Sequence, residues 1–172
     1  QDSEGNTIVN NDKRSCINCN QISFTSSMYP KIKDKYKYVF SPQTAYQITS
    51  MLEGVINRGT GKKLKKLKLN LAGKTGTTNE NTDAWFIGFT SNLVIGVYVG
   101  MDNPSPLGKF ETGSKTALPI VESFIKKAVK KFEARPFKVS EDITMMVVDS
   151  LTGQKAKFSS KDTIMEAYKS KN

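Results

Sequence analysis

Residues 71–78 read Leu71-Ala72-Gly73-Lys74-Thr75-Gly76-Thr77-Thr78, and this stretch predicts a β-strand from residue 71 to residue 77. Side chains alternate between the two faces of a strand, so Thr75 and Thr77 share one face while Lys74 and Gly76 share the other. Two hydroxyls on one face can bind a carboxylate, and outward backbone N–H groups can donate to a developing oxyanion. The stretch therefore predicts a site for an anionic substrate, with Lys74 adding positive charge.

A phosphate-binding loop is the main alternative for this stretch, because Gly73-Lys74-Thr75 resembles the end of such a loop. That motif needs a glycine five positions before Gly73, where this chain has Lys68, and a helix that opens after the threonine. Gly76 argues against a helix there. We therefore prefer the strand.

Two helices are predicted around this strand. The first begins after Ser41, a good N-cap followed by Pro42, and stops at Gly59. The second is predicted over residues 119–133. The residues expected on their buried faces are Ala45, Ile48, Leu52, Val55 and Ile56 in the first helix, and Val121, Phe124, Ile125, Ala128, Val129 and Phe132 in the second.

Two more strands are predicted over residues 84–89 and 93–102, joined by a hairpin connection and apolar enough to be covered on both faces. For residues 61–70 we expect a loop and strand with the leucines turned inward rather than a basic functional surface. Residues 143–148 form a possible strand that turns at Thr152-Gly153, and residues 159–172 are expected to be peripheral and partly mobile.

The composition excludes several kinds of site. The chain has 172 residues, a net charge of +10 and no histidine, which excludes a Ser-His-Asp triad and zinc sites that need histidine. No nucleic-acid-binding motif accompanies the lysines, so we expect a solvated basic surface and no nucleic-acid partner. The longest apolar run, Leu93 to Met101, is too short to span a bilayer. No cofactor is predicted.

Cys16 and Cys19 form a Cys-x-x-Cys pair in a polar segment, residues 1–40, that lacks sustained periodicity and contains a possible hairpin around Gly5. A zinc site would need two further ligands. A local disulfide or two bystander thiols is the favoured interpretation, and a redox pair is the alternative.

The surroundings of residues 71–78 carry a family resemblance. Residues 58–61 read Arg-Gly-Thr-Gly, residues 83–89 read Asp-Ala-Trp-Phe-Ile-Gly-Phe, and the strand Val-Ile-Gly-Val-Tyr-Val-Gly-Met-Asp, Thr112-Gly113 and Ala117-Leu118-Pro119-Ile120 follow. Together with Lys74-Thr75-Gly76, these closely resemble the C-terminal half of the transpeptidase domain of class A, bifunctional penicillin-binding proteins. The resemblance is sharpest between residues 41 and 124. Ser114 departs from it, because a second glycine is expected there.

The resemblance implies an α/β (α+β) three-layer sandwich of the serine transpeptidase and β-lactamase type, with an antiparallel sheet flanked by helices and incomplete in this chain. It implies an irregular segment at 1–40, a core at 41–134 and a tail with a possible hairpin at 135–172. Lys74 and the Thr77 backbone N–H would be catalytic, and Thr75, Gly76 and Thr77 would bind substrate. The implied location is the periplasmic side of the bacterial inner membrane.

The implied partners are a peptidoglycan stem peptide, β-lactams and the N-terminal half of the same enzyme. In this family a serine in Ser-x-x-Lys and a second motif, Ser-x-Asn, accompany Lys-Thr-Gly. We expect neither Ser-x-x-Lys nor Ser-x-Asn anywhere in this chain. We therefore expect the chain to lack the nucleophile and to be inactive alone. The rival hypothesis is a non-catalytic basic module that binds cell-wall polymer or a protein partner.

Overall fold

The computed structural model describes residues 15–17, 31–33, 39–128 and 135–170. The chain divides into two compact units, residues 1–40 and 41–172, which are described separately. In the first unit, β1 (Ser15–Ile17) pairs antiparallel with β2 (Lys31–Lys33), with Cys16 opposite Ile32. Cys19 and the predicted hairpin around Gly5 lie outside the described residues, so both the pairing of the cysteines and that hairpin stay predictions.

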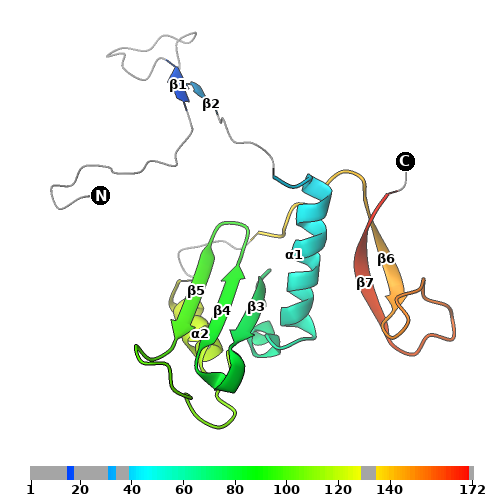
Figure 1. The fold of residues 1–172 in the computed structure, drawn as a ribbon. Coiled ribbons are helices and arrows are strands. Elements are labelled where there is room, and N and C mark those ends of the chain that lie inside the picture. Colours follow the sequence, from blue (N-terminus) through cyan, green and yellow to red (C-terminus); the bar gives the residue numbers. More distant parts are fainter. Residues whose placement is uncertain (1–14, 18–30, 34–38, 129–134, 171–172) are drawn as a thin grey trace. The chain divides into compact units, whose positions relative to one another are not determined.

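The second unit is built on an antiparallel sheet with the strand order β3-β4-β5. These strands are β3 (Ala72–Thr77), β4 (Ala84–Phe89) and β5 (Val94–Val99), and a short 3₁₀ turn, η2 (Asn79–Asn81), connects the first two. The three central strands predicted from the sequence are thus confirmed. Figure 1 shows them side by side, with α1 next to β3.

The first helix, α1 (Pro42–Asn57), confirms the capping prediction, because the Ser41 side chain accepts a hydrogen bond from the Thr44 N–H. The predicted buried face is only partly correct. Ile56 is buried, whereas Ala45 and Ile48 are exposed. Of the predicted face, Ile56 joins the core cluster, and Leu52 and Val55 are half-buried.

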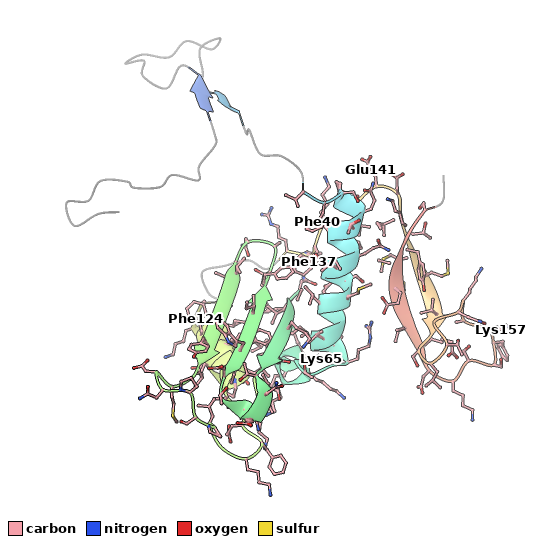
Figure 2. The ribbon with its side chains drawn as sticks, in the orientation of Figure 1. Phe40, Lys65, Phe124, Phe137, Glu141 and Lys157 are labelled. Atoms are coloured by element: carbon pink, nitrogen blue, oxygen red, sulfur yellow. The ribbon has the colours of Figure 1, made fainter. Side chains whose placement is uncertain are left out.

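The second helix, α2 (Ala117–Ala128), begins two residues before the predicted start, and residues 129–134 lie outside the described part of the chain. Val121 and Ile125 are buried as predicted. Phe124, which is predicted in the same stripe, is instead 49% exposed. It lies beside β5 (Figure 2). Successive residues are about 100° apart around a helix, so Phe124 lies about 60° around the helix from Val121, at the margin of the buried face.

The lysine-rich segment at 62–67 is a 3₁₀ helix, η1 (Lys62–Leu67), and not the predicted loop and strand. Leu64 is buried in the core, and Leu67 and Leu69 pack against it. Spacing of three residues brings Leu64 and Leu67 to the same side of a 3₁₀ helix. The inward leucines were therefore predicted correctly, although the backbone that carries them was not.

The core lies on one face of the sheet, beneath α2 and η1, and Phe86 is completely buried in it. A Cβ at Gly73 or Gly88 would lie 2.7 Å or 2.5 Å from the Phe86 ring, so these paired glycines make room for it. The opposite face is open: Trp85, Ile87 and other large side chains are 41% and more exposed there. The prediction that these strands are covered on both faces is therefore wrong for the described residues.

A C-terminal hairpin pairs β6 (Ile143–Asp149) with β7 (Thr163–Lys169). Asp149 accepts N–H bonds from Leu151 and Thr152, which fix the predicted turn and lower the pKa of this carboxyl group, the Thr152 N–H most strongly. The hairpin contacts α1, because Gln47 donates to the Ala167 carbonyl at 3.1 Å. Residues 163–169 therefore form a strand, which the sequence did not predict, whereas the expected mobility of residues 159–172 stays a prediction.

Candidate functional site

The Lys-Thr-Gly stretch lies on β3, an edge strand of the described sheet. Thr75 is opposite Phe86 on β4, so Thr75 and Thr77 face the side of the sheet that contains the core. Lys74 faces the open side and is exposed, and its ammonium group donates to the Thr75 carbonyl at 2.7 Å. The predicted division of the four residues between two faces is thus present in the structure.

The backbone N–H of Thr77 points away from β4. Opposite pairs in an antiparallel ladder alternate between hydrogen-bonded and non-bonded. The Thr78 N–H donates to the Asp83 carbonyl at 3.1 Å, so the next pair, Thr77 with Ala84, is a non-bonded pair. The Thr77 N–H is consequently available on the outer edge of β3 as a donor to a bound group.

The Thr77 hydroxyl is fixed by a loop that precedes α2. It accepts a hydrogen bond from the Gly113 N–H at 3.1 Å. Because a hydroxyl has one donor and two acceptor positions, Thr77 can still donate its own proton to an anion. Gly113 is buried, and a Cβ there would lie 2.4 Å from the Trp85 carbonyl oxygen and 2.6 Å from the Gly76 carbonyl oxygen.

We expect Gly113→Ala to lower the stability of this chain by about 2 kcal/mol, because the new methyl group would displace the loop from two backbone carbonyls. Gly96→Ala is the matched control, since a Cβ at Gly96 meets no atom within 4 Å. Thermal unfolding followed by circular dichroism measures both. Equal melting temperatures for the two variants would contradict the close approach of the loop to β3.

The Thr75 hydroxyl lies 2.8 Å from the hydroxyl of Thr60, in the loop between α1 and η1. Thr60 belongs to the stretch Arg58-Gly59-Thr60-Gly61, and the family resemblance predicts no role for it. Its position between two glycines is the signal that could have drawn attention to it.

Asp83 and Trp85 lie at the end of the site strand, where Trp85 is opposite Gly76 and the Asp83 carbonyl accepts from the Thr78 N–H. The Asp83 carboxylate accepts a hydrogen bond from the Tyr98 hydroxyl at 2.8 Å, and this bond is the main cause of a raised pKa for Tyr98. The Trp85 and Tyr98 rings lie 4.6 Å apart. The Asp83 N–H donates to the Thr78 hydroxyl at 2.8 Å, which closes the turn between β3 and β4.

A Ser-x-x-Lys string does occur after the site strand, so the expectation that the chain lacks one is wrong. Ser123 and Lys126 on α2 have this spacing. The Lys126 ammonium is paired with Glu122 at 2.6 Å. α2 packs mainly against β4 and β5 on the core face of the sheet, whereas the Lys-Thr-Gly stretch lies on β3 and Lys74 projects from the opposite face. This pair therefore does not form a nucleophile and base for the site around Lys74.

A Ser-x-Asn string is also present, at Ser170 and Asn172. The Ser170 hydroxyl pairs with the Thr144 hydroxyl at 2.9 Å within the hairpin, and Asn172 lies outside the described residues. The structure therefore gives no link between this string and the Lys-Thr-Gly strand.

Within the described residues, three or more His, Cys, Asp or Glu side chains nowhere gather closely enough to hold a metal ion. Across those same ranges, each helix is too short or too polar to cross a membrane.

Comparison with known proteins gives a family. Residues 7–126 match the family model described as "Penicillin binding protein transpeptidase domain". Penicillin-binding protein 1A of Rickettsia conorii is 42% identical across the whole chain, and penicillin-binding protein 1A of Pseudomonas aeruginosa is 38% identical over 78% of it.

A solved structure is also similar. The crystal structure of penicillin-binding protein 1A from Haemophilus influenzae matches with a TM-score of 0.65 and 32% identity, covering 74% of this chain and 20% of that one. The chain spans 22% of the length of its Rickettsia conorii relative and 16% of the Pseudomonas aeruginosa protein. The match to the family model covers residues 7–126, which include α1 and the strands β3, β4 and β5. The chain therefore belongs to the penicillin-binding protein transpeptidase domain family.

Proposed function

We propose that this chain supplies the Lys-Thr-Gly wall of a class A peptidoglycan D,D-transpeptidase and works with a part of the enzyme that carries the nucleophilic serine. The observation that supports this most directly is the arrangement on β3. Lys74 lies on the open face, the hydroxyls of Thr75 and Thr77 share the other, and the Thr77 N–H points outward. These groups provide a positive charge, two hydroxyl donors and a backbone donor along one strand.

Each group has a role in acyl transfer from a D-Ala-D-Ala stem peptide. The hydroxyls of Thr75 and Thr77 bind the terminal carboxylate, which accepts hydrogen bonds only. The Thr77 N–H donates to the oxyanion that forms when serine attacks the scissile carbonyl, and such donors are strongest where water is excluded. Gly76 keeps this wall free of a side chain, and Lys74 stabilises negative charge and the proton network. β-Lactams would acylate the same serine.

The finer architecture belongs to this proposal. The β3-β4-β5 sheet would be the middle of a three-layer sandwich, with two further strands supplied by the N-terminal half of the enzyme. Residues 41–134 would be the core of the transpeptidase part, with residues 1–40 and 135–172 as its flanking segments. The enzyme would act on the periplasmic side of the inner membrane, where peptidoglycan is cross-linked.

This chain alone should form no covalent adduct with a fluorescent penicillin, because its one Ser-x-x-Lys pair lies on α2, on the face of the sheet opposite Lys74. The measurement is in-gel fluorescence with mass spectrometry, and the same chain assembled with its catalytic N-terminal half is the positive control. An adduct on Ser123, the serine with a lysine three positions later, would overturn the proposed division of the site. A second outcome, no adduct in the assembled enzyme either, would favour the non-catalytic binding module.

A further inference from the structure

The loop between α1 and η1 is built to hold Thr60 in one place. Three backbone N–H groups bond to the last turn of α1. Those of Gly59 and Gly61 donate to the Val55 carbonyl at 3.1 Å and 3.0 Å, and that of the C-cap residue Arg58 donates to the Gly54 carbonyl at 2.9 Å. Larger residues do not fit on either side of Thr60. A Cβ at Gly59 would lie 2.9 Å from the Val55 Cα, and one at Gly61 would lie 2.7 Å from the Ile56 side chain.

A second contact holds the same loop from outside the matched domain. Arg58 forms an ion pair with Glu166 on β7, whereas the match to the transpeptidase family ends at residue 126. Gly54 leaves space for this arrangement, since a Cβ there would lie 2.9 Å from the Arg58 guanidinium. The hairpin and the helix thus fix the loop independently of the site strand.

Either hydroxyl of the Thr60–Thr75 contact can be the hydrogen-bond donor, and the choice decides whether Thr75 can bind an anion. Each hydroxyl has one proton to donate and two lone pairs to accept with. If Thr75 donates to Thr60, it presents only lone pairs to an anion and repels it. If Thr60 donates to Thr75, the Thr75 proton is free to be donated to a carboxylate, and the two bonds polarise each other.

We propose that Thr60 is a positioning residue that orients the Thr75 hydroxyl toward the substrate carboxylate. This inference rests on the proposed function, in which Thr75 binds that carboxylate. Thr60 does not itself touch the substrate. The two hydroxyls lie 2.8 Å apart, and in the proposed arrangement Thr60 is the donor and Thr75 the acceptor. The glycines beside Thr60 and the Arg58–Glu166 pair keep its hydroxyl at that distance.

The test uses the assembled enzyme and compares second-order acylation rates for a penicillin and for its methyl ester, which has no carboxylate. Thr60→Val keeps the volume and removes the hydroxyl. We expect it to lower the rate with the penicillin by about tenfold, because the Thr75 hydroxyl would lose the donor that directs its own proton toward the charged carboxylate, and to change the ester rate less than about twofold. Thr60→Ser should restore the penicillin rate. Thr49→Val is the control, because the Thr49 hydroxyl bonds only to its own helix at Ala45.

A double-mutant cycle tests whether the effect of Thr60 depends on the Thr75 hydroxyl. If Thr60 acts through Thr75, adding Thr60→Val to Thr75→Val should cost nothing further. Equal losses on penicillin and ester, or additive losses in the cycle, would overturn the proposal and leave Thr60 a structural residue. The ratio of the two rates stays informative even if the variant is partly unfolded, since unfolding lowers both rates equally. If Thr75→Val itself fails to separate penicillin from ester, the proposed role of Thr75 is wrong, which is a different failure.

Discussion

Replacing Lys74 with alanine in the assembled enzyme should lower the rate of acylation by penicillin by about a hundredfold or more. Lys74 is the cation on the open face of β3, and its ammonium reaches the Thr75 carbonyl at 2.7 Å. Removing one preorganised electrostatic contact from a transition state costs on the order of 10²–10³ in rate. A charge that also assists proton transfer should lie at the upper part of this range.

Two further variants provide comparisons for the rate of Lys74→Ala. Thr77→Ala removes a hydroxyl and keeps the backbone N–H, so its loss should be about tenfold and should fall mainly on carboxylate binding. Lys157→Ala makes the same change of charge on the exposed hairpin loop (Figure 2) and should have no effect on the rate. Stopped-flow acylation with a fluorescent penicillin measures all three. Parental rates for both Lys74→Ala and Thr77→Ala would show that the site has been assigned to the wrong strand.

Local signals in the sequence predicted the elements of this fold well. The N-terminus of α1 could be predicted because Ser41 and Pro42 act within one turn, and the Ser41 side chain does cap the helix. The alternation on β3 likewise fixed which of the four site residues share a face. These predictions need no knowledge of the partner elements.

Contacts between distant segments could not be predicted in the same way. The paired glycines at 73 and 88 fit the ring of Phe86 only because the β3-β4 register places them together. The link from Gly113 to Thr77 and that from Thr60 to Thr75 join segments 36 and 15 positions apart. Each depends on packing that is decided by the whole unit, and a single sequence contains no local pattern that reports it.

β7 is a second feature that the sequence alone did not predict. Residues 163–169 read Thr-Ile-Met-Glu-Ala-Tyr-Lys, without the strict alternation that predicts a half-buried strand. The strand forms because it pairs along its length with β6 and is bordered by α1. Propensity is a weak guide where such tertiary contacts decide the conformation.

The outer edge of β5 should change most when the rest of the enzyme is added. Among the described strands, β5 pairs only with β4. Val94 on β5 is 73% exposed, and Ile120 and Phe124 on α2 are each 49% exposed. These side chains line an apolar groove of ≈ 290 Å³ between β5 and α2. An unpaired apolar edge is a ready template for another strand. We therefore expect the isolated chain to associate with itself unless the N-terminal half covers this edge.

Hydrogen exchange can test this expectation at single amides. The Thr90 N–H donates to the Leu93 carbonyl at 2.8 Å, so ladder alternation directs the N–H groups of Val94, Gly96 and Tyr98 outward and those of Ile95 and Val97 toward β4. In dilute isolated chain the outward amides should exchange rapidly. Co-expressed N-terminal half should slow them on the order of a hundredfold, because a new strand would bond to them. The inward amides are the internal control and should change much less.

If the outward amides are already slow in a monomeric isolated chain, and adding the N-terminal half has no effect, then β5 is not an interface with the catalytic part. The chain would then be a self-sufficient domain, as the binding-module hypothesis requires.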